Sequence, residues 1–497
     1  MLPVLTPSSL GLEGYDAGFR DVQLEVLNYM EQGQEAFLAI ESPTGTGKSL
    51  IAVAHQKQTG ARVRILTRTI SLMQQYMRDF SSHAVTMKGR GNFPCVWDEA
   101  NSDTAANAPC TDGINCPVRS ICPYYIQRGI AEAHPLVVTS YAYYFAETMF
   151  ASGDVSECDV LICDEAHRLR DILDDLFQVQ VRREEWERLD SMPVEDTLPL
   201  WGESAARALQ MLELDKSVGD KKWRQKMRRK ARSVLWYAKS AEPHIIYSMG
   251  GTVFFSPLWP KLTHVPIRAE QVVFLSGTLY GGKHFADMLG IPEEQYSFIS
   301  LPSPFNVDRR PVYIEPVVAM NARTSEADYM RMAEHIKGVW ARHPGQKGMI
   351  HVNSNAQAAA IYSALGREHV ILHCGEQGED RQRLFEQFRS APRGTYLLSP
   401  SAGEGEDFPN EQCRVNIIAK VPYPYLGDPL VSARMNDGPF GKKDYAAQTV
   451  MQISQMIGRA MRSEADWGAT YVLDSNVRNL LKFNRPLWPD YILAALR

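Results

Sequence analysis

The feature that most constrains the fold is a glycine-rich loop placed between an apolar strand and a helix. Residues 37–41 favour a short strand, residues 50–54 favour a helix, and between them lies Ser42-Pro43-Thr44-Gly45-Thr46-Gly47-Lys48-Ser49. Glycines let backbone N–H groups converge on phosphate oxygens, and a helix N-terminus favours an anion. The pattern predicts a P-loop in which Thr44, Gly45, Thr46 and Gly47 surround the phosphates of ATP, Lys48 reaches the β- and γ-phosphates and Ser49 ligates Mg²⁺. A glycine- and threonine-rich turn without a ligand is the alternative, and Ser42 stands where the motif usually has glycine.

A second apolar run ends in two adjacent carboxylates. Residues 159–163 favour a buried strand, and Asp164-Glu165-Ala166-His167 follows it. A carboxylate at the carboxyl end of such a strand can hold Mg²⁺, and its neighbour can polarise the attacking water. Acidic strand ends are common, but after an upstream P-loop they predict a site of ATP hydrolysis with Lys48, Asp164 and Glu165 as catalytic residues.

Four of the eight cysteines lie close together in a segment rich in glycine, asparagine, proline and aspartate. They are Cys95, Cys110, Cys116 and Cys122. Residues 90–123 contain no long strand or helix pattern, so this segment buries little core of its own and a bound metal would order it. Four thiolates suit Zn²⁺ and an iron–sulfur cluster equally well by ligand count, and four unligated cysteines are a further alternative. Paired Cys-x-x-Cys knuckles, typical of structural zinc, are absent.

Bulk composition sets wider limits. The chain has 497 residues, 44% of them hydrophobic, and a net charge of −5, which indicates several folded units and does not by itself indicate a nucleic-acid binder. A local basic surface is still possible, and residues 221–232 carry a strongly basic run that suits a phosphate-binding face and a solvated helix equally well. We find no long apolar run and no signal-peptide pattern, so we expect no membrane association and a cytoplasmic location.

Further segments resemble superfamily 2 helicases. Phe274-Leu275-Ser276-Gly277-Thr278-Leu279 resembles the motif that couples hydrolysis to strand movement, and Gln455-Met456-Ile457-Gly458-Arg459-Ala460-Met461-Arg462 resembles the last helicase motif. The flanks of the cysteine segment, Lys88-Gly89-Arg90-Gly91-Asn92-Phe93-Pro94-Cys95 and Cys122-Pro123-Tyr124-Tyr125, resemble those of the XPD/DinG family of iron–sulfur DNA helicases. The resemblance extends over nearly the whole chain.

This resemblance implies roles for residues whose function the sequence pattern alone does not indicate. Arg459 and Arg462, which lie on one helix face, would reach across a cleft to the transferring phosphoryl group. Gln23, Asp407 and Gln455 would contact the nucleotide, although Gly403 and Asn410 depart from the family pattern around Asp407. The residues that would contact DNA are Thr67, Arg68, Thr69, Ser276 and Thr278. The four clustered cysteines would hold a [4Fe–4S] cluster.

The predicted fold is α/β, with two RecA-like motor domains built on parallel sheets. We expect motor domain 1 to comprise residues 1–89, 126–170 and 245–283. An iron–sulfur insert at 90–125 and a reduced, helical, arch-like insert at 171–244 would interrupt it. Motor domain 2 would comprise residues 284–497.

The expected function is that of an ATP-dependent DNA helicase. It would translocate along single-stranded DNA, 5′ to 3′ by resemblance alone, and unwind duplex DNA at forks and other junctions. An RNA helicase, and an ATP-switched DNA-binding subunit without processive unwinding, are the alternatives. ATP, Mg²⁺ and the [4Fe–4S] cluster are the expected cofactors.

Overall fold

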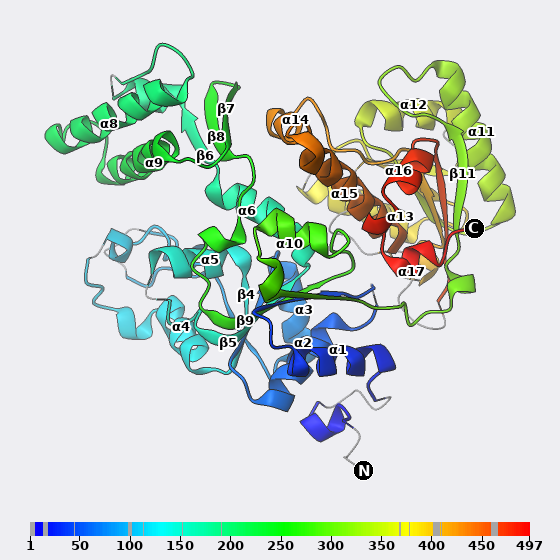
Figure 1. Cartoon of the computed structure of the whole chain (residues 1–497), viewed down its shortest axis with the longest axis horizontal. Coiled ribbons are helices and arrows are strands. Elements are labelled where there is room, and N and C mark those ends of the chain that lie inside the picture. The colour runs from blue at the N-terminus through cyan, green and yellow to red at the C-terminus, as the bar shows by residue number, and fades with distance from the viewer. Residues whose placement is uncertain are drawn as a thin grey trace.

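The computed structural model contains two α/β lobes, with a smaller unit beside the first (Figure 1). It describes residues 5–497 apart from residues 13–17, 44, 98–101, 113, 152, 190, 367–368, 377, 401–407, 409 and 459–465. Among the described residues, no helix is both long and apolar enough to cross a membrane.

The first lobe is built on a seven-stranded parallel sheet with the order β10-β1-β9-β5-β2-β4-β3. Its central strands are nearly continuous apolar runs, as expected for a parallel sheet that is covered on both faces. The carboxyl ends of β1, β5 and β9 are neighbours, so the loops after these strands meet at one edge. The strands are β1 (Phe37–Glu41), β2 (Val63–Thr67), β3 (Val85–Met87), β4 (Leu136–Ser140), β5 (Cys158–Asp164), β9 (Ala269–Ser276) and β10 (Tyr296–Ser300).

The helices of the first lobe alternate with these strands, as the βα pattern predicts. They are α1 (Asp21–Gln32), α2 (Lys48–Thr59), α3 (Ile70–Phe80), α4 (Pro123–Ala133), α5 (Tyr141–Phe150), α6 (Leu169–Phe177) and α10 (Lys283–Leu289).

The second lobe is a six-stranded parallel sheet with the order β11-β16-β15-β12-β14-β13. Its strands are β11 (Val312–Val318), β12 (Gly348–His351), β13 (Val370–Leu372), β14 (Tyr396–Ser399), β15 (Val415–Ile418) and β16 (Ala469–Asp474). Its helices are α11 (Glu326–Arg342), α12 (Asn355–Leu365), α13 (Gly378–Ser390), α14 (Pro429–Met435), α15 (Gly438–Ile457), α16 (Val477–Phe483) and α17 (Asp490–Leu493). Two lobes with parallel sheets confirm the predicted α/β class.

The boundary predicted between the lobes at residues 283 and 284 is wrong. Strand β10 pairs with β1 in register from Phe37↔Tyr296 to Glu41↔Ser300, so the first lobe extends to about residue 300. All five β10 residues are only partly buried, as befits an edge strand. Such a strand lacks the apolar run by which central strands are found in a sequence.

The insert after the acidic strand spans about residues 178–257. It was predicted to be helical, but it also contains a sheet. It consists of an antiparallel sheet of β6 (Val179–Arg182), β8 (Thr252–Pro257) and β7 (His244–Met249), with α7 (Arg183–Glu187), α8 (Leu198–Leu214) and α9 (Lys221–Lys239). Trp186, Trp201 and Phe255 are fully buried within it, so this insert has a core of its own. Residues 245–257 therefore belong to the insert and not to the first motor.

The cysteine insert, residues 88–122, joins β3 to α4. Its described residues form the short turns η2 (Arg90–Asn92), η4 (Pro109–Asp112) and η5 (Arg119–Ile121) and one isolated bridge between Pro94 and Thr104. This agrees with the prediction that the segment contains no long strand or helix.

Candidate functional site

The predicted P-loop has the strand–loop–helix geometry that phosphate binding requires. Gly45 and Gly47 have φ values of 80° and 81°, a region that favours glycine, and α2 begins at Lys48. Thr46 Oγ1 donates to Pro43 O at 2.8 Å, and the Lys48 ammonium lies 3.4 Å from Ser42 O. Thr44 lies outside the described residues.

Gln23 is buried against this loop. Its Nε2 donates to Thr46 O at 2.8 Å, and its Oε1 accepts from Arg20 N at 2.9 Å. Arg20 Nη1 also donates to Gly45 O at 2.7 Å. The structure thus places Gln23 at the predicted nucleotide site, where it supports the loop backbone.

The two acidic residues lie beside the P-loop at the end of β5. Tyr76 Oη donates to Asp164 Oδ2 at 3.1 Å and also hydrogen-bonds to Ser49, so one phenol joins the two predicted Mg²⁺ ligands. Glu165 has a left-handed φ of 52°, and its backbone N donates to Asp164 Oδ1 at 3.0 Å. Ser49 and Asp164 are the residues that could hold Mg²⁺ here.

The two carboxyls have opposite pKa shifts. Burial raises the pKa of Asp164 to about 6, and the Glu165 charge adds to this effect. Burial also opposes the ionisation of Glu165, but the hydrogen bond from His167 and the Lys48 charge hold its pKa below the usual range. A divalent cation beside Asp164 would favour its ionised form.

His167 connects three parts of the site. Its Nδ1 lies 2.8 Å from Ser276 Oγ and 3.2 Å from Glu165 Oε2, and its Nε2 is in contact with Gln455 Nε2 from α15 of the second lobe. His167 has no predicted role, although its place in the Asp164-Glu165-Ala166-His167 run is a signal that could identify it. Gln455, predicted to contact the nucleotide, lies at the contact between the lobes.

The other predicted residues of the second lobe lie outside the described residues. These are Asp407, Arg459 and Arg462. Their roles remain predictions.

The predicted DNA-contacting residues differ in exposure. Arg68 is exposed after β2, but the Thr69 hydroxyl accepts from Leu72 N and caps α3. Thr67, Ser276 and Thr278 are all buried, with relative exposures of 0%, 0% and 3%. The side chains of these three residues face the interior in this arrangement, and their contact with DNA stays a prediction.

A buried charge cluster joins the lobes beside this site. Arg170 of α6 pairs with Asp444 of α15, and both side chains are at most 5% exposed. His284 Nε2 lies 3.4 Å from the same carboxylate, and Gln448 Nε2 donates to it at 2.7 Å. Arg170 and the His284 hydrogen bond outweigh burial and lower the pKa of Asp444 to about 2. No local sequence pattern predicts this cluster.

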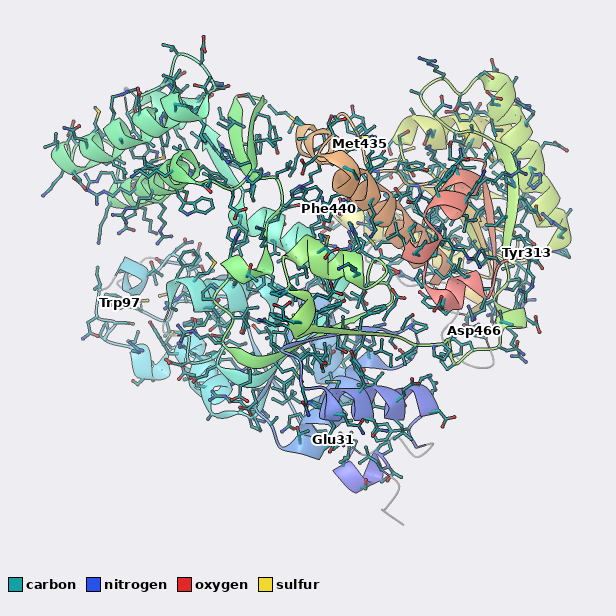
Figure 2. The ribbon with its side chains drawn as sticks, in the orientation of Figure 1. Glu31, Trp97, Tyr313, Met435, Phe440 and Asp466 are labelled. Atoms are coloured by element: carbon teal, nitrogen blue, oxygen red, sulfur yellow. The ribbon has the colours of Figure 1, made fainter. Side chains whose placement is uncertain are left out.

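A second set of contacts lies next to the buried charge cluster. Arg434 of α14 donates through Nη1 to Asp174 Oδ2 of α6 at 2.8 Å. Trp259 Nε1 donates to Asp437 Oδ2 at 2.6 Å, and its ring packs against Phe440 with centroids 4.7 Å apart. Phe440 is labelled between the two lobes in Figure 2.

The four predicted metal ligands lie in one insert but are not assembled into a centre. Among the described residues, no three His, Cys, Asp or Glu side chains form a group that could hold a metal ion. Cys110 Sγ lies 3.7 Å from Arg90 Nη1, and Cys122 is buried at the start of α4. Thiol donors suit the predicted iron–sulfur cluster, but the structure does not show it.

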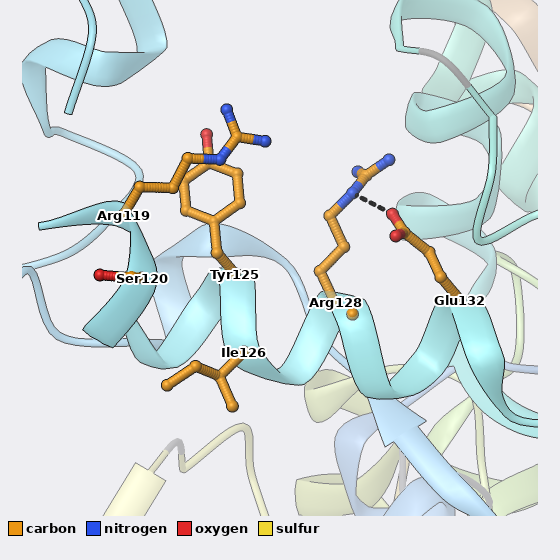
Figure 3. A pocket seen from close by; sticks show the side chains of 7 residues that line it. Arg119, Ser120, Tyr125, Ile126, Arg128 and Glu132 are labelled. Carbon is orange, nitrogen blue, oxygen red and sulfur yellow. Dashed lines mark hydrogen bonds and ion pairs between the residues drawn. The ribbon is translucent and has the colours of Figure 1, made fainter.

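An open pocket lies beside this insert, where η5 meets α4 (Figure 3). The Arg119 guanidinium lies over the Tyr125 ring, 4.1 Å from its centroid, and Arg128 pairs with Glu132 at 2.7 Å.

Together, the two parallel sheets and the P-loop define a two-lobed P-loop protein whose predicted catalytic carboxylates are linked to the second lobe through His167. Residues 17–192 match the family model described as type III restriction enzyme, res subunit, and residues 339–485 match the helicase C-terminal domain.

Several known proteins resemble the chain. It is 22% identical to the ATP-dependent DNA helicase YoaA of Escherichia coli, over 92% of this chain and 91% of that protein. It is also 22% identical to the 3′-5′ exonuclease DinG of Bacillus subtilis, over 42% of this chain and 24% of that protein. Its fold resembles S. tokodaii Xpd4, with a TM-score of 0.62, 16% identity and coverage of 93% and 97%. Together, these matches support an ATP-hydrolysing helicase enzyme that is similar to the XPD/DinG-like helicases of superfamily 2.

Replacing Lys48 with alanine should abolish ATP hydrolysis. The variant removes the cation expected at the β- and γ-phosphates, so we expect turnover to fall by roughly 100-fold or more. Phosphate release at saturating ATP measures this, and Lys57→Ala, near the other end of α2, serves as the control. Hydrolysis by Lys48→Ala at the rate of the control would contradict the site.

Replacing Asp444 with asparagine should destabilise the protein strongly at neutral pH. It leaves the Arg170 charge buried without its partner, which costs about 3–5 kcal/mol. Because the pKa of Asp444 is lowered from 3.8 to about 2, its contribution is complete above pH 3.8 and is lost as the pH falls through 2. The difference in unfolding free energy between Asp444→Asn and the wild-type protein should therefore become smaller as the pH falls.

Denaturant unfolding between pH 7 and pH 2 measures this difference. Glu293→Gln, at the exposed pair with Lys283, is the control and should leave the unfolding free energy nearly unchanged, because solvent screens this pair. A small, pH-independent effect of Asp444→Asn would contradict the assignment.

Proposed function

We propose that this protein is a DNA helicase that uses ATP hydrolysis to move along single-stranded DNA and to separate duplex strands. The observation that carries the proposal is the contact of His167 with Glu165, Ser276 and Gln455. One imidazole thus touches the predicted catalytic base, the coupling motif and the second lobe. A movement of the second lobe can therefore reach the hydrolytic centre directly. The name of the Escherichia coli relative supports DNA as the substrate.

The proposed cycle follows from the arrangement of the site. The first lobe supplies Lys48, Ser49, Asp164 and Glu165, and we propose that Arg459 and Arg462 of the second lobe complete the site when the lobes close on ATP. Gln23 and Asp407 would contact the nucleotide. Hydrolysis removes the γ-phosphate that both lobes bind, so the closed form loses its energetic advantage and the lobes separate.

The proposed DNA path crosses the carboxyl ends of the strands in both lobes. Arg68 is an exposed cation at this edge of the first lobe and would contact a phosphate. Binding of this kind carries little sequence preference and weakens with salt. We propose 5′-to-3′ movement and action at forks, by family resemblance.

The basic run of α9 is a second candidate for phosphate contact. Met227 is buried and Trp223 is partly buried in the core of the insert, so one face of α9 packs inward. Lys226 and Lys230 both pair with Glu185, so part of the positive charge is neutralised internally. Lys222 Nζ donates to Asn107 O at 3.1 Å, so α9 also contacts the cysteine insert.

The proposal predicts directional strand separation that depends on ATP. Duplexes with a 5′ or a 3′ single-stranded tail should be separated by wild-type protein in the 5′-tailed form only. Lys48→Ala should bind the same tailed duplex with nearly unchanged affinity and release no strand, since it retains Arg68 and the rest of the DNA path. DNA binding with ATP hydrolysis but without strand release would instead support an ATP-switched binding subunit. Stimulation of hydrolysis by RNA alone would support an RNA helicase.

We also propose that Cys95, Cys110, Cys116 and Cys122 hold a [4Fe–4S] cluster that orders the cysteine insert. The four thiols are donors of the right kind within one insert, and Arg90 Nη1 lies 3.7 Å from Cys110 Sγ. A bound cluster would supply the cross-links that this insert otherwise lacks. A Zn²⁺ ion bound by the same four thiolates is the alternative.

Cys116→Ser should therefore lose bound iron and sulfide and the brown colour of the protein. We expect strand separation to fall more than ATP hydrolysis without DNA, because the cysteines lie outside the ATP site. Iron, sulfide and zinc analysis of anaerobically purified protein measures the outcome, with Cys374→Ser in the second lobe as the control. Zinc in place of iron, or unchanged metal in Cys116→Ser, would contradict the proposed cluster.

A further inference from the structure

The segment after α16 returns from the second lobe to the first. Tyr491 Oη, in α17, donates to Gly277 O at 3.0 Å, and Gly277 belongs to the coupling loop, which we define as residues 276–282. Tyr491 and Trp488 are buried in the same apolar cluster as Leu279 of the coupling loop. The C-terminal segment, residues 484–497, therefore packs directly on the motif that is predicted to couple hydrolysis to movement.

The same segment also follows the linker between the lobes. Arg310 Nη1 donates to Tyr491 O at 2.6 Å. Val312 N donates to Ala495 O at 2.9 Å, and Arg497 N donates to Val312 O at 2.9 Å. The C-terminal segment is thus bonded to the coupling loop at one end and to the start of β11 at the other.

The coupling loop is fixed from the first lobe on its other side. Ser42 N donates to Ser276 O at 2.7 Å, which joins the coupling loop to the P-loop. Leu279 N donates to the buried carboxylate of Glu41 at 2.7 Å, and Tyr280 Oη donates to His167 O at 2.8 Å. A shift of this loop would therefore reach both the P-loop and His167.

The contact between the coupling loop and the C-terminal segment is too close to admit a side chain. Tyr280, Gly281 and Gly282 have successive positive φ values of 53°, 72° and 65°. A Cβ on Gly281 would lie 2.5 Å from Pro486 O. The close approach of Gly281 to Pro486 therefore ties the coupling loop sterically to the C-terminal segment. In addition, Thr278 Oγ1 is buried and has no hydrogen-bond partner in the described structure.

We propose that Tyr491 is a positioning residue for the coupling loop. Its hydroxyl holds the Gly277 carbonyl, so that movement of the second lobe displaces the coupling loop and with it Ser276 and His167. Separating the two groups would leave a buried donor and a buried acceptor unpaired, so the segment and the loop move together. The inference rests on the proposed function, because it concerns how that activity is coupled to lobe movement.

Tyr491→Phe tests the inference, because it removes the hydroxyl and keeps the ring. We expect the DNA-stimulated turnover of ATP to fall roughly five-fold, the factor for one lost hydrogen bond of ordinary strength. The ATP consumed per base pair separated should rise, while the affinity for a fluorescent ATP analogue stays unchanged.

Tyr445→Phe is the matched control. Tyr445 Oη donates to Pro424 O at 3.0 Å within the second lobe. The Tyr445→Phe variant therefore loses the same kind of hydrogen bond, but away from the coupling loop. Equal losses in the two variants, or a wild-type coupling ratio in Tyr491→Phe, would overturn the inference. Absence of DNA stimulation in the wild-type protein would instead refute the proposed function.

Discussion

The buried pair of Arg170 and Asp444 is the constraint on which the arrangement of the two lobes depends. Neither charge can be left alone in the interior without a large cost in free energy, so α6 of one lobe and α15 of the other must stay together wherever the fold is intact. Gln455 lies further along the same helix α15 and contacts His167. A single helix therefore bears both the fixed contact and the residue that touches the catalytic site, which makes the pair a natural pivot for lobe movement.

Local motifs allowed the first half of the site to be predicted. The P-loop and the Asp164-Glu165 pair each occupy a few consecutive residues, and parallel strands bring their carboxyl ends to one edge of the sheet, so sequence alone predicted their meeting. Gln23 could be placed by resemblance, and the structure puts it against Thr46.

The contacts between the lobes could not be predicted in this way. Arg170 and Asp444 are 274 positions apart, and His167 and Gln455 are 288 apart, so no local pattern marks either pair. Strand β10 was missed because an edge strand lacks a continuous apolar run. Ser276 and Thr278 were predicted to face DNA, whereas tertiary packing buries them.

The antiparallel sheet of the insert at residues 178–257 has a consequence for how such enzymes can vary. The chain enters through β6 and leaves through β8, and these strands are direct partners, with Val179 opposite Phe255. The two ends are thus one strand spacing apart, and the aromatic core between them belongs to the insert alone. A unit joined in this manner can be lengthened, shortened or exchanged while the first sheet keeps its register. The insert can therefore diverge between related enzymes without a change in the ATP site of the first lobe.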